Sequence, residues 1–95
     1  MEKAELAAKM QENQAWVEGK KIKIDYDDKG VVMLDGVNHQ VTEEDGEADT
    51  TIKVKWEDWQ AMADGQLDGM TAFMTGKLKV EGDMGLAMKL GSVLS

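Results

Sequence analysis

The pattern of apolar and polar positions along the chain begins with a helical period. Over residues 2–17, Leu6, Met10 and Val17 lie on one stripe, while Glu and Lys occupy most of the remaining positions. No helix-breaking residue occurs before Gly19. We therefore expect a helix over residues 2–17 that packs on a core and keeps its charged side in solvent.

From residue 20 the apolar period changes to two, which indicates strands. Ile22, Ile24 and Tyr26 alternate with charged residues, so the first strand has one apolar face. A turn sequence at residues 27–30 and an Asp-Gly pair at residues 35–36 separate it from further strands. The pattern predicts a three-stranded meander with strands at residues 21–26, 31–34 and 37–42.

The second half of the chain mixes strands with short helices. The acidic segment 43–49 is expected to be a solvated loop. Asp68 and Asp83 are expected to cap helices, and Gly76 to end one. The predicted elements are a strand at residues 50–56, helices at 57–63 and 69–75, a strand at 77–81 and a last helix at 84–94.

Lysines mark one face of the predicted sheet, because they alternate with apolar residues along three of its strands. A charged face opposite an apolar face is typical of a sheet that helices cover on one side. The interleaved Asp25 and Glu81 favour a solvated face over a docking surface for anionic membranes. These lysines are Lys21, Lys23, Lys53, Lys55, Lys77 and Lys79. The prediction is an α+β fold: a five-stranded, mostly antiparallel sheet with helices covering one face, in the order α-β-β-β-β-α-α-β-α.

Composition excludes several function classes. The length of 95 residues suits about one domain, so we expect a single domain over residues 1–95. A net charge of −8 argues against nucleic-acid binding, which needs a basic surface. No run of about 18 apolar residues could span a membrane, and the charged start of the chain is unlike a secretory signal.

No combination of residues predicts catalysis or a metal site. The single histidine, His39, has no cysteine to partner it, so a solvated or structural role is favoured. Residues 25–30 resemble the start of a calcium loop, but Lys29 and Gly36 stand where ligand oxygens are needed. The Gly-Asp-Met-Gly sequence at residues 82–85 is too short for a dinucleotide fingerprint. We expect a protein that is not an enzyme and has no cofactor.

The last predicted helix, residues 84–94, is apolar on nearly every side and has Lys89 as its only charge. Such a helix has to be buried by something. The chain also contains eight Met but only one Phe and one Tyr. Because Met fills ordinary cores as well as lining adaptable apolar sites, its abundance alone favours a core and leaves a ligand site open.

Several stretches of the second half match one protein family. They are residues 72–74 (AFM), residues 76–90 (GKLKVEGDMGLAMKL) and the strand at residues 48–54 (ADTTIKV). The helix that contains Trp59 and Met62 lies where the family also has a helix. On these residues the chain resembles the sterol carrier protein 2 family of lipid-transfer domains, in a small stand-alone form.

The resemblance implies an apolar tunnel between the sheet and the helices, which holds a fatty acid, a fatty acyl-CoA, a sterol or a phospholipid. We expect its floor at Ile24, Val54 and Val80. Each position could equally be ordinary core. The expected walls are Trp59, Met62, Met70, Phe73, Met74, Met84, Met88 and Leu94.

The expected partner is therefore a lipid, with at most transient membrane contact, in a monomer or weak homodimer. The last residues, Ser-Val-Leu-Ser, lack the peroxisomal tripeptide, which favours the cytoplasm. An empty, rigid slot of about 300 Å³ would cost roughly 7 kcal/mol, against a total stability of about 5–15 kcal/mol. We therefore expect a lipid to fill it. The alternative is an interaction or dimerisation module without lipid transport.

Overall fold

The computed structural model describes residues 2–94, with positions 28, 63, 69 and 90–94 described in their backbone only. The helices are α1 (Lys3–Glu12), α2 (Trp56–Ala63), α3 (Gly69–Met74) and α4 (Met84–Leu94), together with a short 3-10 helix η1 (Asp27–Lys29). The strands are β1 (Lys21–Asp25), β2 (Val31–Asp35), β3 (Gln40–Thr42), β4 (Thr50–Val54) and β5 (Leu78–Gly82). The predicted order of helices and strands is confirmed.

The strands form one five-stranded sheet in the order β3-β2-β1-β4-β5. The pairs β1–β2, β2–β3 and β4–β5 are antiparallel, and β1–β4 is parallel. In this register Ile24 of the central strand lies between Val32 and Ile52. The mostly antiparallel sheet and the meander of the first three strands are therefore as predicted.

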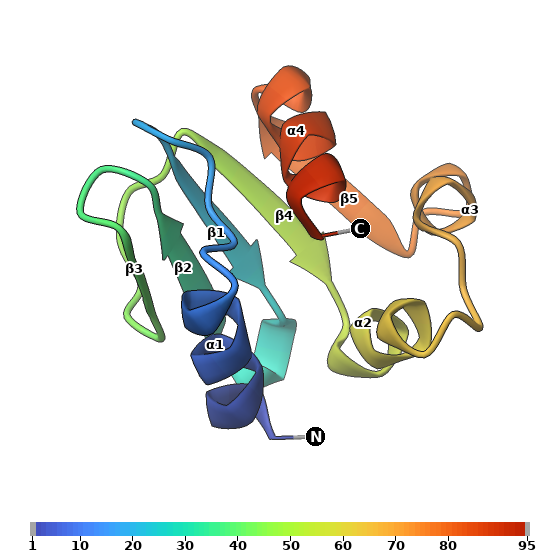
Figure 1. The fold of residues 1–95 in the computed structure, drawn as a ribbon. Helices are drawn as coiled ribbons and strands as arrows, with labels where there is room; N and C mark the ends of the chain where they lie inside the picture. The colour runs from blue at the N-terminus through green and yellow to red at the C-terminus, as the bar shows by residue number, and fades with distance from the viewer. Residues whose placement is uncertain (1, 95) are drawn as a thin grey trace.

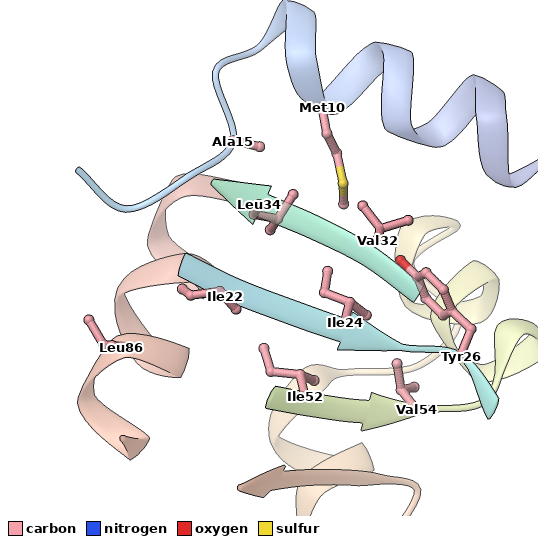
Figure 2. Close-up of a cluster of buried hydrophobic side chains, with 10 residues drawn as sticks. All are labelled: Met10, Ala15, Ile22, Ile24, Tyr26, Val32, Leu34, Ile52, Val54 and Leu86. Atoms are coloured by element: carbon pink, nitrogen blue, oxygen red, sulfur yellow. The ribbon is translucent and has the colours of Figure 1, made fainter. Parts of the chain in front are cut away.

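The core lies on one face of the sheet, beneath α1 and α4. Ile22, Ile24 and Tyr26 are fully buried, as their alternation with charged residues predicts. Figure 1 shows α1 and α4 on the same side of the sheet. Figure 2 shows Met10 from α1 and Leu86 from α4 directed toward the apolar strand residues.

The helix caps lie at the residues predicted from the sequence. Asp68 accepts a hydrogen bond from the Thr71 backbone N–H at 3.3 Å, and the Asp83 carboxylate accepts one from Gly85 N–H at 2.8 Å. Gly76 follows α3 with a φ of 79°. Because a carboxylate satisfies an amide that has no partner within the helix, these aspartates place the starts of α3 and α4 where they were expected.

α1 is shorter than the helix predicted over residues 2–17, because it ends at Glu12. Gln14 adopts a left-handed backbone with a φ of 54°. The Ala15 N–H then donates to the Met10 carbonyl at 2.9 Å, and both side chains enter the core. The prediction was wrong at this end, because burial of Ala15 turns the chain back onto the core without glycine.

β3 begins at Gln40, and not at Val37 as expected from the Asp-Gly pair. Residues 36–39 form a loop instead. The nearly buried carboxylate of Asp35 accepts hydrogen bonds from Val37 N–H at 2.9 Å, Asn38 N–H at 3.0 Å and the Asn38 side chain at 2.9 Å. These bonds close a wider loop than the two-residue turn that the sequence predicted.

β4 ends at Val54, so the strand predicted to run to Trp56 is also too long. Trp56 is instead the first residue of α2, whose first turn carries Glu57 and Asp58. Acidic side chains stabilise the positive end of a helix, which favours a helical start here. The Trp56 ring nevertheless contacts Tyr26 edge-on, with ring centroids 4.9 Å apart.

Packing differs between the two halves of the molecule. Apart from Val31 at the start of β2, the apolar residues of β1, β2 and β4 are buried, whereas Leu78 and Val80 of β5 are only partly buried. None of the described side chains of α2 is fully buried. We call residues 56–88, with α2, α3, β5 and the first part of α4, the open half. No helix within residues 2–94 has the length and apolar character needed to cross a membrane.

Candidate functional site

The residues expected to contact a lipid occupy three levels of burial. Ile24 and Val54 are packed in the core at 0% and 4% exposure. Trp59, Met62 and Val80 are partly buried against that core. The remaining described side chains are exposed: Met70, Phe73, Met74, Met84 and Met88. The side chain of Leu94 lies outside the described residues.

The most exposed of these side chains are methionines of α3 and α4. Met74 is 78% exposed and Met88 is 74% exposed. Apolar residues therefore extend from the packed core, through the partly buried residues of the open half, to the molecular surface. Flexible Met side chains can adjust to an apolar surface of irregular shape, so this region can cover an extended apolar ligand.

An aromatic cluster lies at the boundary between the packed core and the open half. Tyr26 follows the end of β1, and its ring meets Trp59 of α2 edge-on, with centroids 5.7 Å apart and an interplanar angle of 72°. Trp56 packs edge-on against the same Tyr26 ring. The cluster joins α2 to the sheet through aromatic contacts.

Two polar atoms of this cluster have no hydrogen-bond partner in the part of the chain that the structure describes. They are the Tyr26 hydroxyl oxygen and the Trp59 Nε1, and both are buried from solvent. Sequence reasoning placed Tyr26 inward but did not include it in the site. The signal was present, because an inward Tyr in an otherwise apolar stripe brings a hydroxyl that needs a partner.

The opposite face of the sheet carries the lysines, as predicted. An open hollow of about 280 Å³ lies there, and Lys53 forms an ion pair with Glu81 at 3.2 Å. The acids between the lysines make this face mixed in charge, in keeping with a solvated surface. The hollow is lined by Asp25, Asp27, Lys53, Val54, Lys55, Gly76, Lys77 and Lys79.

The acidic loop at residues 43–49 is held against β1. Asp45 accepts a hydrogen bond from Lys23 Nζ at 2.8 Å, and this bond lowers the pKa of Asp45. The Asp49 carboxylate accepts from the Lys21 backbone N–H at 2.9 Å. Within residues 2–94, no group of three or more His, Cys, Asp or Glu side chains is arranged to hold a metal ion.

His39 contacts an aromatic ring and a carboxylate. Its ring stacks on Trp16 with centroids 5.5 Å apart, and its Nε2 lies 2.6 Å from a carboxylate oxygen of Glu18. Among the described residues no nucleophile is paired with it. The contacts agree with the structural role expected from the sequence.

Comparison of the sequence with known families and proteins gives consistent matches. A family model described as the SCP-2 sterol transfer family matches residues 2–95. Sterol carrier protein 2 of Bos taurus is 43% identical over 60 residues, which are 63% of this chain and 11% of that protein. Hydroxysteroid dehydrogenase-like protein 2 of Danio rerio is 40% identical over 70 residues, or 70% of this chain and 17% of that protein. The matched region is thus a small part of these curated relatives.

Comparison with solved structures shows the same fold. The solution structure of sterol carrier protein 2 from Aedes aegypti, in complex with the C16 fatty acid palmitate, has a TM-score of 0.80. The alignment covers 100% of this chain and 96% of that chain at 19% sequence identity. The similarity confirms the arrangement of the sheet and helices described above.

Proposed function

Because this chain belongs to the SCP-2 sterol transfer family, we propose that it binds and transfers a lipid without catalysing a reaction. The ligand is a fatty acid, a fatty acyl-CoA, a sterol or a phospholipid. The main support for the proposal is the family match, because the matched residues 2–95 include the sheet and helices α1 to α4. The palmitate bound to the Aedes aegypti relative supports a long acyl chain as one ligand.

We place the lipid against the open half of the molecule, where apolar side chains are partly or largely exposed. Fully covering one Met or Phe side chain is worth about 1.5–3 kcal/mol, so a lipid that covers several of them gains a useful binding energy. The proposed contact residues of the open half are Trp59, Met62, Met70, Phe73, Met74, Val80, Met84 and Met88. Leu94 and the packed residues Ile24 and Val54 complete the proposed site, and a lipid contacts Ile24 and Val54 only where it enters between the sheet and the helices.

Substitution of Met88 by Arg tests this placement. Met88 is 74% exposed, so Met88→Arg should leave the fold intact. It should abolish lipid uptake, because the bound lipid would force an unpaired cation into an apolar contact. Uptake is measured by displacement of a fluorescent fatty-acid analogue, and folding by circular dichroism.

Val37→Arg is the matched control, because Val37 is also exposed, at 56%, but lies in the loop between β2 and β3. This variant should take up lipid as the unmodified protein does. Normal uptake by Met88→Arg would contradict the placement. Unfolding of that variant would indicate that Met88 belongs to the ordinary core.

The exposed apolar side chains of α3 and α4 also suit a second function, an interaction or dimerisation module without lipid transport. In that case a second protein surface would cover Met70, Met74 and Met88. Sedimentation velocity separates the two proposals. A monomer with bound lipid supports the carrier, and an obligate dimer without lipid supports the module.

A further inference from the structure

Two buried donors in the aromatic cluster are unused by the protein itself. Tyr26 has 0% exposure, and its hydroxyl has no partner among the described residues; the Trp59 Nε1 is likewise buried and has none there. Buried polar groups are nearly always hydrogen-bonded, because an unpaired group loses its bonds to water without compensation. Phe at either position would pack as an aromatic ring without this loss. The two donors therefore suggest a partner that comes from outside the chain.

The two donors belong to different elements. Tyr26 follows the central strand, whereas Trp59 lies on α2, whose described side chains are all partly exposed. Their ring centroids are 5.7 Å apart. Figure 2 shows the Tyr26 ring lying over the sheet, with its hydroxyl on the side of Val32. A small movement of α2 would open the space between the two rings to a ligand.

We propose that the Tyr26 hydroxyl and the Trp59 indole N–H bind the polar end of the lipid, and that this end is uncharged. A hydroxyl or carbonyl oxygen would accept both hydrogen bonds while the apolar part of the ligand lies along the open half. This inference rests on the proposed lipid binding and identifies the residues that contact the polar end of the ligand. Among the proposed ligands it favours a neutral one, such as a sterol, over those with a carboxylate or phosphate.

The surroundings of the Tyr26 hydroxyl favour an uncharged polar end. All eleven basic residues are Lys, and Lys53, Lys55, Lys77 and Lys79 line the hollow on the opposite face of the sheet. Burial raises the pKa of Tyr26, and no cation of a described residue offsets this rise. A carboxylate or phosphate placed here would lose its hydration without an ion pair, whereas a neutral oxygen needs only the two donors.

Three ligands with the same C16 chain test the proposal: hexadecan-1-ol, hexadecane and hexadecyl sulfate, each delivered from cyclodextrin. Their affinities are measured by displacement of a fluorescent fatty-acid ester. One or two hydrogen bonds should make the unmodified protein bind hexadecan-1-ol about fivefold to thirtyfold more tightly than hexadecane. Hexadecyl sulfate should bind more weakly than the alcohol.

The variants Tyr26→Phe and Trp59→Phe each remove one donor and keep an aromatic ring. The alcohol-to-hydrocarbon affinity ratio within each variant should fall about fivefold, and this ratio cancels any general loss of packing. Trp56→Phe is the control, because Trp56 contacts the same Tyr26 ring but is not one of the unpaired donors. Its ratio should equal that of the unmodified protein.

Nuclear magnetic resonance of the unmodified protein tests the Trp59 contact directly. The indole N–H resonance of Trp59 should shift when hexadecan-1-ol is added and should shift less with hexadecane. An unchanged ratio in both Phe variants, or tighter binding of hexadecyl sulfate than of the alcohol, would overturn this inference and leave lipid binding intact. Failure of all three ligands to bind the unmodified protein would overturn both proposals.

Discussion

Gln14 shows how one residue can end a helix without the usual sequence signal. Its φ of 54° places it in the left-handed region, which usually favours glycine. Gln14 N–H donates to the Gln11 carbonyl at 3.2 Å, and Ala15 N–H donates to Met10 at 2.9 Å. These are the two bonds of a Schellman motif. The sequence has no glycine at this helix end, and the apolar pair Met10 and Ala15, which is buried beside the motif, is the one local signal for it.

We predict that Gln14→Gly stabilises the protein by about 0.5–1 kcal/mol, because glycine adopts the left-handed backbone without a steric cost from a β-carbon. Urea unfolding followed by circular dichroism measures the change. Gln14→Ala is the control, since it removes the same polar side chain but keeps the β-carbon. A Gly variant no more stable than the Ala variant would contradict the left-handed conformation.

At the scale of elements, the β2–β3 connection depends on one nearly buried carboxylate. Asp35 is 5% exposed and accepts three hydrogen bonds from Val37 and Asn38. The backbone and side-chain bonds from Asn38 are the main reasons why the pKa of Asp35 is lowered. The charged form of Asp35 therefore holds the loop that leads to the edge strand β3.

Asp35→Ala should lower the free energy of unfolding at pH 7 by about 1–3 kcal/mol, because it leaves the loop donors without their acceptor. A folded-state pKa below the unfolded value of about 3.9 means that this stabilisation is complete above that pH and is lost as the pH falls through the folded value. The difference between Asp35→Ala and the unmodified protein should therefore shrink in acid.

Asn38→Ala provides a graded control, because it removes one of the three bonds and should cost less than Asp35→Ala. Urea unfolding at pH 7 and at about pH 3, below the ordinary carboxyl pKa, measures both variants. A stability difference that stays constant between these pH values would show that the charge of Asp35 does not hold the loop.

Most of the elements could be predicted because each carries a local signal. The alternation of Ile22, Ile24 and Tyr26 defined the central strand, and Asp68 and Asp83 defined two helix starts. The boundaries that were missed depend on burial and on side-chain hydrogen bonds that the apolar pattern does not contain. Burial of Ala15 ends α1, and the carboxylate of Asp35 widens a loop. Burial of Ala15 is a tertiary contact, whereas the Asp35 bonds are local but compete with the two-residue turn that an Asp-Gly pair favours.

At the scale of the whole molecule, the site was harder to predict than the fold. Apolar composition identified Met70, Met74 and Met88 as candidate walls but could not show that their side chains would be exposed. The same composition would suit a core or a surface that a ligand covers. The unpaired donors of Tyr26 and Trp59 became visible only when strand and helix were brought together.

The packed half and the open half differ in how completely they bury their apolar side chains. β1, β2 and β4 bury most of the residues that hold the fold together, whereas α2, α3, β5 and α4, whose places in the fold are seen in Figure 1, leave several apolar side chains partly or largely exposed. A lipid that covers these side chains would replace water at apolar surface, which is favourable in proportion to the area covered. We therefore expect the protein to retain a lipid through purification.

Native mass spectrometry of the purified protein, paired with organic extraction and lipid mass spectrometry, tests lipid binding most directly. We predict a species heavier than the bare chain, whose added mass equals that of a lipid recovered in the extract. Only the mass of the bare chain, an extract without lipid and no displacement of a fluorescent fatty acid would together contradict lipid binding.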